Sequence, residues 1–375
     1  MRTRSDRLIE IGRTIVTVVL FFGILGALVV IHELGHFIVA RLFRVRVLEF
    51  GIGFPPRAKV LRDVGETVYT LNWLPIGGFV KLEGEDGDEA DDPRSFAAQG
   101  LPKKILILVA GVVMNVALAA AIFTGIALTG DPAIGVYVPY VEPGSPAESA
   151  GIEVGDVIER VNGEAFGAFG PSSVLAELHD SAGKTVTLAV RRADAVIDIT
   201  ATLRTPDQVR DGKGALGIGQ QGTLPLEPRS TPDRIHYPVD TALRLGLERT
   251  ESAMRVIIDG VGQLASAIIT RPTEPPPASG PIGIATQIGD IFWTLGPIVT
   301  LYLAGILSAN LAVVNILPFP PLDGGRIMLL LIKRVAGTRL SVRAERLTYV
   351  VGFVFLMAFL VWVTGFDIAR GLGGG

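Results

Sequence analysis

The stretch TIVTVVLFFGILGALVVIHELGH, from Thr14 to His36, decides how this chain is organised. It is apolar and uncharged until its last five residues, and a membrane-spanning helix needs about 20 predominantly apolar residues. Ionisable side chains then follow in the HELGH sequence at 32–36, where a membrane segment carries them only at a cost. The stretch therefore predicts a span over about 14–40 with a polar site at one end.

The composition of the whole chain also indicates a membrane protein. Of 375 residues, 49% are hydrophobic and only 19% are charged, which is more apolar than is usual for a soluble protein. Lys and Arg (34) nearly balance Asp and Glu (37), so no basic excess favours a nucleic-acid partner. Because cysteine is absent, a transition metal would need histidine and carboxylate ligands.

Three further apolar stretches are long enough to cross a bilayer. They lie at 105–129, 291–317 and 347–366, and none of them contains a charged residue. The first stretch is longer than the apolar core of a signal peptide, about 7–15 residues, so we interpret it as a retained helix. The chain is thus predicted to be a polytopic α-helical membrane protein with four transmembrane helices.

The distribution of Lys and Arg predicts the orientation of these spans. Segment 41–104 carries ten such residues and segment 324–346 carries six, and a Lys/Arg excess marks cytoplasmic loops. Segment 130–290 and both termini then face the extracytoplasmic side. The arginines near the N-terminus argue mildly against this topology.

Segment 48–82, on the predicted cytoplasmic side, alternates as β-strands do around a turn at Asp63–Gly65. It carries Phe54 and Trp73 beside the predicted polar site, so a membrane-associated β-hairpin region is expected there. Backbone of this kind enters a bilayer only where protein satisfies its hydrogen bonds.

The predicted outside segment changes to a soluble composition, and part of it resembles a PDZ domain. The resemblance rests on four glycine-containing elements in one order, Glu142–Ala147, Ala150–Ile152, Gly155–Ile158 and Val161–Gly163. An α+β PDZ domain is therefore expected at 131–205, inserted between the N-terminal and C-terminal membrane parts.

A PDZ fold offers a groove beside a strand, where an extended peptide adds by main-chain pairing. The groove strand is expected near 133–138, and the alternative is a domain that only plugs or braces the membrane part. Segment 206–290 is expected to be a linker with an amphipathic helix over 240–269, which the Pro-rich link at 271–277 ends.

The residues His32-Glu33-Leu34-Gly35-His36 form a His-Glu-x-x-His motif on the predicted helix. Spacing of four residues puts both imidazoles on one face, where they chelate one metal ion and leave Glu33 as a general base. The same five-residue pattern also arises by chance. The alternative is that these polar residues simply end the span at the membrane interface.

A catalytic zinc site has three protein ligands and one open position, so a third ligand must come from elsewhere. The other histidines, His179 and His236, lie in the predicted outside segment. The sequence NILPFPPLDGG, from Asn315 to Gly325, supplies Asp323 at the cytoplasmic end of the third span. The charge distribution places this aspartate on the same side as the HELGH motif.

Together these motifs resemble the site-2 protease family of intramembrane zinc metalloproteases. The likeness covers nearly the whole chain, because Gly111–Asn115 resembles the Gly-x-x-x-Asn element of the family and Ser279–Ile284 resembles the segment before its third span. Within the family, the chain is similar to the bacterial regulator-of-sigma-E protease (RseP-like) group. It differs from the two-PDZ members in having room for a single PDZ domain, which puts a two-domain substrate filter in doubt.

The resemblance implies one Zn²⁺ ion held by His32, His36 and Asp323. Ligand chemistry agrees, since imidazole and carboxylate groups are zinc ligands. Glu33 would take a proton from the water that attacks the peptide and return it to the leaving amine.

The resemblance also implies substrate-binding roles for Asn315, Pro318 and Pro320, which would hold an unwound substrate. The alternative is that the two prolines only end the helix. Gly111 and Asn115 are expected to support the site, and Asn115 either joins two spans or donates to an oxyanion.

The implied function is that of an intramembrane zinc metalloendopeptidase, which cleaves transmembrane segments of single-span proteins such as anti-sigma factors in regulated intramembrane proteolysis. Its expected place is the bacterial cytoplasmic membrane, with the active site towards the cytoplasm and the PDZ domain outside. That domain would exclude untrimmed substrates by size, or bind a new C-terminus. The rival interpretations are a non-catalytic PDZ-bearing scaffold with a structural zinc, and a transporter, which the lack of an internal repeat disfavours.

Overall fold

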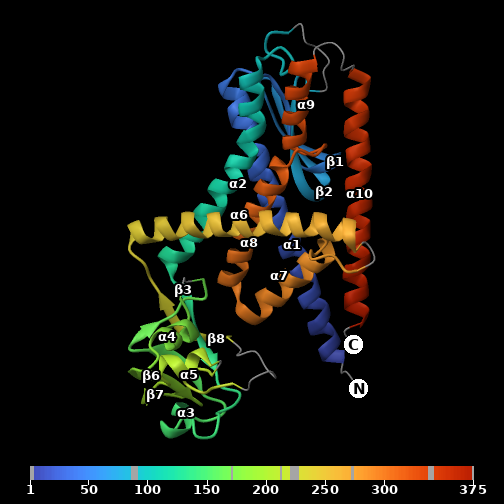
Figure 1. Cartoon of the computed structure of the whole chain (residues 1–375). Coiled ribbons are helices and arrows are strands. Elements are labelled where there is room, and N and C mark those ends of the chain that lie inside the picture. Colours follow the sequence, from blue (N-terminus) through green and yellow to red (C-terminus); the bar gives the residue numbers. More distant parts are fainter. Residues whose placement is uncertain are drawn as a thin grey trace. The chain divides into compact units, whose positions relative to one another are not determined.

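The computed structural model describes residues 4–85, 92–169, 172–211, 213–219, 228–271, 274–336 and 342–373. They form two compact units. Unit 1 comprises residues 1–123 and 245–375, and unit 2 comprises residues 124–244. Two long helices, α2 and α6, continue from one unit into the other, so the chain enters and leaves unit 2 through helices (Figure 1).

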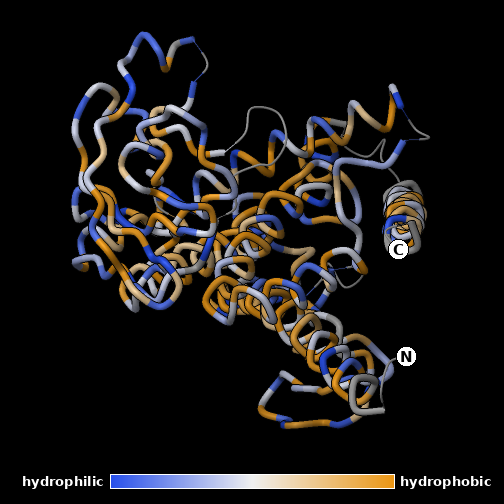
Figure 2. Tube along the Cα trace, turned by 90° about the horizontal axis from the view of Figure 1, so that it is seen from below, coloured by the Kyte–Doolittle hydropathy of each residue, from blue (hydrophilic) through white to orange (hydrophobic). Residues whose placement is uncertain are grey.

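Unit 1 is mainly helical, and hydrophobic residues dominate along its helices (Figure 2). The helices are α1 (Arg4–Leu42), α2 (Leu101–Thr129), α6 (Val239–Thr270), α7 (Pro281–Leu295), α8 (Pro297–Ile316), α9 (Asp323–Ala336) and α10 (Val342–Gly373). Within the described ranges, five of them are long and apolar enough to cross a membrane: α1, α2, α6, α8 and α10. The prediction of a polytopic helical membrane protein is confirmed at this level.

The helix α6 is the extra candidate beyond the four predicted spans, and it differs from the others. It has the lowest hydropathy of the five and is strongly amphipathic, as expected for segment 240–269. Its apolar residues Ala253, Met254 and Ile257 pack against a small cluster around Phe123 and Ala309. In Figure 1 this helix runs across α2 and α8 rather than along them.

The predicted span 291–317 is wrong as one continuous helix. The helix α7 ends at Leu295 and α8 begins at Pro297, with Gly296 between them at φ 85° and ψ 179°. Proline lacks the N–H that a continuing helix needs, and glycine tolerates the positive φ of the break. The 20 residues of α8 extend about 30 Å, which is enough to cross the hydrocarbon core without α7.

Two long antiparallel strands follow α1, namely β1 (Val47–Val64) and β2 (Thr67–Leu82). The turn between them contains Gly65 at φ 67°, in agreement with the expected turn. The pairing is irregular, because Phe50 lies opposite both Tyr69 and Val80 of β2. The hairpin therefore folds back on itself, and its Phe50 and Tyr69 rings pack against Phe37 of α1.

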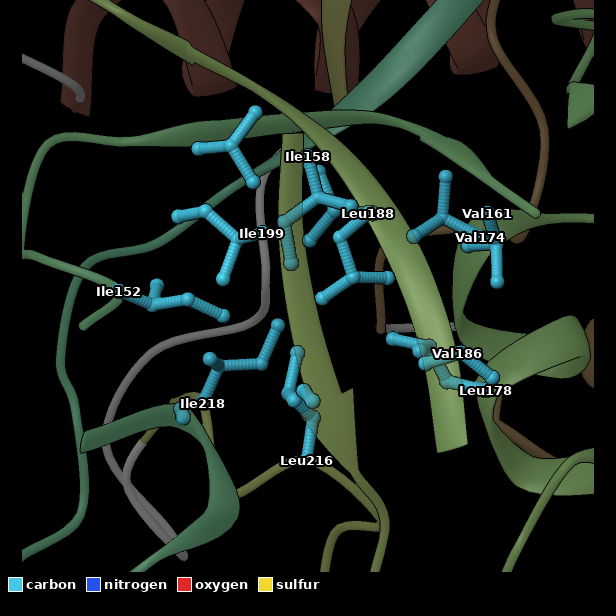
Figure 3. Packing of buried hydrophobic residues seen from close by; sticks show 14 of the residues in the cluster. Ile152, Ile158, Val161, Val174, Leu178, Val186, Leu188, Ile199, Leu216 and Ile218 are labelled. Atoms are coloured by element: carbon cyan, nitrogen blue, oxygen red, sulfur yellow. The ribbon is translucent and has the colours of Figure 1, made fainter. Parts of the chain in front are cut away.

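The described residues of unit 2 form a six-stranded sheet and three short helices. Its elements are β3 (Asp131–Tyr137), α3 (Pro146–Ser149), β4 (Val157–Val161), β5 (Glu164–Ala165), α4 (Val174–Asp180), β6 (Thr185–Arg192), β7 (Ala195–Thr202), α5 (Pro206–Arg210) and β8 (Pro228–Ile235). The main path of the sheet is β7-β6-β4-β3-β8, with β5 beside β4. Figure 3 shows the core, in which Ile158 and Leu188 are fully buried and Leu178 of α4 covers one side.

The strand β3 includes most of segment 133–138, where a free groove edge was expected, and that expectation is wrong. One side of β3 pairs with β4, as in Val136↔Ile158, and the other side pairs with β8, as in Asp131↔Ile235. The physical reason is that β8, from the segment expected to be a linker, adds to β3. Unit 2 accordingly extends beyond 131–205 on both sides.

Candidate metal centre

The polar end of α1 supplies two histidines to a buried site in unit 1. His32 and His36 are one helical turn apart, and their exposed fractions are 5% and 8%. Their ring centroids are 4.8 Å apart. The four-residue spacing therefore places both rings on one face of α1, as the motif predicts.

Asp323 joins these two histidines from the first turn of α9. Its Oδ2 atom lies 3.0 Å from Nε2 of His32 and 3.3 Å from Nε2 of His36. The two Nε2 atoms are 3.2 Å apart. Among the described residues, these three form the one group of three or more potential His, Cys, Asp or Glu ligands whose donor atoms converge in this way.

The chain reversal before α9 explains how Asp323 reaches α1. A side chain on Gly324 would overlap the backbone of Ile316 and Leu317, and one on Gly325 would overlap the backbone of Phe319 and Pro320. Only glycine permits so close an approach of the chain to itself. The two glycines thus allow α9 to start directly against the end of α8.

Close packing of α1 on α2 is the second requirement of the site. A Cβ atom on Gly111 would lie 2.6 Å from Nε2 of His36 and 2.7 Å from Nε2 of His32. On α1, a Cβ atom on Gly35 would overlap the carbonyl of Ala110. Small residues at helix contacts of this kind allow backbones in a membrane to approach closely. Gly111 therefore leaves free the space in front of the two imidazoles.

The donor atoms suit a zinc ion. The Nδ1 atom of His36 lies 2.8 Å from the carbonyl oxygen of Ile107, which can only accept, so Nδ1 carries the proton. The lone pair of His36 is then on Nε2, which faces Asp323. Two imidazole nitrogens and one carboxylate oxygen form a common ligand set for catalytic zinc. The residues present therefore fit the implied metal.

Glu33 lies beside these ligands without being one of them. Its Oε2 atom accepts a hydrogen bond of 3.1 Å from the backbone N–H of Val80 in β2. Its side chain faces a cavity of about 480 Å³ that also exposes His32, His36 and Asp323. Most of the other lining residues are apolar and come from α1, the hairpin, α2 and the α8–α9 region. A carboxylate and three potential ligands thus share one largely apolar cavity.

The three residues predicted to bind substrate lie in different positions around this cavity. Asn315 of α8 lines it directly. Pro318 and Pro320 belong to the connection between α8 and α9, where the neighbouring Pro321 is the proline that lines the cavity. The carbonyl of Pro320 instead faces Gly352 of α10, where a side chain would overlap it.

Several further contacts at the site come from residues that the sequence did not single out. The Ile107 carbonyl and the Val80 N–H are backbone groups, so no side-chain pattern marks them. Arg326, one turn after Asp323, forms an ion pair with Glu85 just beyond β2, and both residues line the cavity. In the sequence, the one feature that could have pointed to Arg326 is its position directly after Asp323-Gly324-Gly325.

Comparisons with known proteins agree with this geometry. The model of Peptidase family M50 matches residues 20–359 of the chain. A Clostridium perfringens protein named "Putative zinc metalloprotease" is 34% identical over 353 residues, which cover 92% of this chain and 96% of that protein. The fold and the site thus define a membrane-embedded zinc metalloprotease, as the sequence predicted.

Two further relatives place the chain more closely. The regulator of sigma-W protease RasP of Bacillus subtilis is 26% identical over 435 residues, covering 94% of this chain and 98% of RasP. The zinc metalloprotease RasP of Geobacillus kaustophilus is also 26% identical, over 436 residues, covering 95% of this chain and 99% of that protein. The chain belongs to peptidase family M50, the site-2 protease family, and is similar to its RseP-like group.

Proposed function

We propose that the protein is an intramembrane zinc endopeptidase that cleaves transmembrane segments of single-span membrane proteins. One observation carries this proposal: His32, His36 and Asp323 converge beside Glu33 in a largely apolar cavity at the polar end of a membrane helix. The sequence similarity to RasP, which is named a regulator of sigma-W protease, supports anti-sigma factors as the class of substrate. Regulated intramembrane proteolysis is the process in which we place it.

In this proposal His32, His36 and Asp323 hold one Zn²⁺ ion. The ion would supply Lewis acidity, which polarises the scissile carbonyl and makes water a nucleophile at neutral pH. The apolar lining of the cavity strengthens electrostatic interactions by excluding bulk water. It also suits a substrate that consists of apolar membrane residues.

Glu33 is the proposed general base. Its Oε2 atom is occupied by the Val80 N–H, which fixes the carboxylate and leaves Oε1 to take the proton from the attacking water. The same oxygen would then return the proton to the leaving amine nitrogen. The contact with Val80 also means that the base is oriented by the β-hairpin and not by α1 alone.

A helical substrate must unwind before its amide can react, because a helix satisfies its own backbone groups. We propose that β2 offers partners to the unwound segment, since Gly77–Val80 line the cavity. Asn315, at the same cavity, is a second polar group for the exposed backbone. Pro318 and Pro320 would act less directly, by shaping the connection from which Pro321 reaches the cavity.

Unit 2 is proposed to contain a PDZ domain that faces the extracytoplasmic space. Its support is the order of glycine turns together with the compact antiparallel sheet and the helix α4. Because both sides of β3 are paired, a groove at β3 is excluded and size exclusion becomes the favoured role. Deleting residues 131–235, which run from β3 to β8, with a short linker in their place should admit substrates that still carry a folded ectodomain.

The proposed location is the bacterial cytoplasmic membrane, with the metal centre on the cytoplasmic side. The support is the Lys/Arg excess in segments 41–104 and 324–346, which flank the polar end of α1 and the start of α9. Accessibility labelling of single cysteines is direct here, since the chain has no cysteine of its own. A cysteine at Lys103 should react from the cytoplasm, and one at Val196 from outside.

The deciding experiment compares the wild type with Glu33→Gln, using zinc analysis and cleavage of a trimmed single-span substrate by the purified protein. We expect both proteins to bind one zinc ion and only the wild type to cut. Glu10→Gln, on the same helix outside the site, is the matched control and should cut normally. Equal cutting by wild type and Glu33→Gln would overturn the role of Glu33. Zinc binding without cutting by the wild type would favour the scaffold.

A further inference from the structure

The side chain of Asn115 contacts the proposed zinc site from behind. Asn115 is fully buried in α2, and its amide lies 3.1 Å from Nδ1 of His32. The ligand atoms converge on Nε2, the other ring nitrogen of His32. Asn115 therefore touches the ligand on the side away from the place where a metal and a substrate would meet.

The two histidines have analogous partners at Nδ1. For His36 the partner is the carbonyl of Ile107, which accepts a proton from Nδ1 and so leaves the lone pair on Nε2. For His32 the partner is the amide of Asn115, which offers either an oxygen or an NH₂ group. A hydrogen-bond acceptor at the ring nitrogen away from the metal is the usual way in which proteins fix the tautomer of a ligating histidine.

The amide of Asn115 is free to present its oxygen. The Oδ1 atom is buried and has no hydrogen-bond partner among the residues that the structure describes, while Nδ2 faces His32. A half-turn of the amide exchanges these two atoms, which are nearly equal in size and shape. Its oxygen then accepts the Nδ1 proton of His32, and the Nε2 lone pair of His32 becomes available beside Asp323.

The backbone around Asn115 holds this side chain in place. Ser308 of α8 is fully buried and donates a hydrogen bond of 2.8 Å to the backbone carbonyl of Asn115. Asn115 is not among the residues that line the cavity, whereas Asn315 is. The observed contact of the Asn115 side chain is with His32 and not with the cavity, which favours a role towards His32 over donation to an oxyanion.

We infer that Asn115 is a positioning residue whose side-chain oxygen accepts from Nδ1 of His32 and thereby sets His32 as a zinc ligand through Nε2. This inference rests on the proposed zinc site and deepens it. It assigns the Asn of the Gly111–Asn115 element to metal affinity and not to transition-state stabilisation. Gly111 and Asn115 then serve one centre from one helix, the first by leaving space and the second by orienting a ligand.

The test is zinc affinity, measured on the full-length protein in detergent by competition with a chromophoric chelator. Asn115→Leu has a similar shape and cannot accept, so it should bind zinc about 10–100-fold more weakly than the wild type. Asn115→Asp can accept but cannot donate, so it should retain zinc within a few-fold and retain cleavage. Val113→Ala, at a half-exposed position on the same helix, is the control and should bind zinc as the wild type does.

Each outcome separates the inference from its alternatives. Normal zinc affinity in Asn115→Leu would overturn it. Full zinc binding with lost cleavage in Asn115→Asp would instead identify an oxyanion donor. A wild type without zinc would refute the proposed metal centre itself, which is a different result from a normal Asn115→Leu variant.

A measurement on the wild type covers the case in which Asn115→Leu does not fold. Nitrogen-15 spectra of the zinc-loaded protein, with His32 assigned by His32→Gln, report which ring nitrogen carries the proton. We expect a protonated Nδ1 on His32 and a change in its shift in Asn115→Asp. A metal-bound Nδ1, or a His32 signal that Asn115→Asp leaves unmoved, would overturn the inference.

Discussion

Both units bury apolar side chains, but unit 1 also exposes large apolar side chains along its helices. In unit 2 the interior is apolar, with Ile158 and Leu188 fully buried. In unit 1 polar groups such as His32 and Asn115 are buried, whereas Val354 of α10 is 61% exposed. The difference follows from the surroundings, since a bilayer accepts apolar side chains and repels polar ones. The membrane-facing surface of unit 1 and the core of unit 2 are therefore both apolar. The apolar side chains point outward in the first and inward in the second.

The two units also differ in how far apart in the sequence the elements that form them lie. The strands of unit 2 other than β8 follow one another between Asp131 and Thr202. The metal centre joins α1, α2 and α9, which are separated by up to 291 positions between His32 and Asp323. A change at the centre of unit 1 should therefore abolish chemistry without unfolding unit 2, and the reverse should hold for unit 2.

The largest effect is expected from Gly111→Ala. The added methyl group would lie about where the two Nε2 atoms face the metal, so zinc binding and cleavage should both be lost. Gly125→Ala is a matched control on the same helix, because a Cβ at Gly125 meets no atom of the described residues within 4 Å. Zinc content and proteolysis check the prediction, and normal zinc content in Gly111→Ala would contradict the geometry.

A core truncation in unit 2 should give the opposite pattern. Leu188→Ala removes a fully buried side chain and should destabilise unit 2 by about 2–5 kcal/mol. Hydrogen exchange in β4 and β6 measures this loss, and zinc affinity should not change. Val196→Ala, at a half-exposed site on β7, should cost less than about 1 kcal/mol. A loss of zinc in Leu188→Ala would show that the two regions are coupled.

The stability of unit 2 should also fall in acid because of Asp156. Burial opposes the charged form, but hydrogen bonds from Arg192 and from the Glu153 N–H hold the pKa of Asp156 below its ordinary value. A carboxylate with a lowered pKa stabilises the folded state above its unfolded pKa, and this stabilisation is lost as pH falls through the lower, folded value. The affected window therefore lies below about pH 4.

The matched variant for this prediction is Asp156→Asn. At pH 7 it should cost about 1–3 kcal/mol, because the charged hydrogen bonds to Arg192 are lost. The difference from the wild type should shrink as the pH falls below 4, which hydrogen exchange at several pH values measures. A difference that stays constant with pH would show that packing, and not charge, explains the cost.

The smallest effect is expected at the membrane-facing surface of unit 1. Val354→Ala on α10 removes apolar surface that lipid replaces equally well, so the cost should be under about 0.5 kcal/mol. Thermal unfolding in lipid nanodiscs, alongside Leu188→Ala, gives the direct contrast. A cost comparable to that of Leu188→Ala would mean that α10 faces protein in a larger assembly.

Sequence patterns predicted those parts of the structure that depend on local spacing. The four-residue interval between His32 and His36 predicts that they share one helix face. The Lys/Arg distribution predicts that Asp323 lies on the same side of the membrane as these histidines. The turn at Gly65 was likewise visible in the sequence. Each of these features can be predicted from helical periodicity, from strand alternation or from the number of Lys and Arg residues in a loop.

Features that depend on tertiary contacts were not predictable in this way. The strand β8 has few β-branched residues, and it becomes a strand only because β3 offers it an edge. The break at Gly296 was missed because length and hydropathy dominated the prediction of the third span. The contact of Asn115 with His32 depends on how α2 is rotated against α1, which one sequence does not fix.

The central claim is that the protein cuts inside a membrane segment at the site formed by His32, His36, Asp323 and Glu33. Its most direct test is mass spectrometry of the products formed when the purified wild type and Glu33→Gln act on a trimmed single-span substrate in liposomes. The account predicts new termini within the apolar segment for the wild type and none for Glu33→Gln. Products cut only outside the segment, or identical products from both proteins, would contradict it.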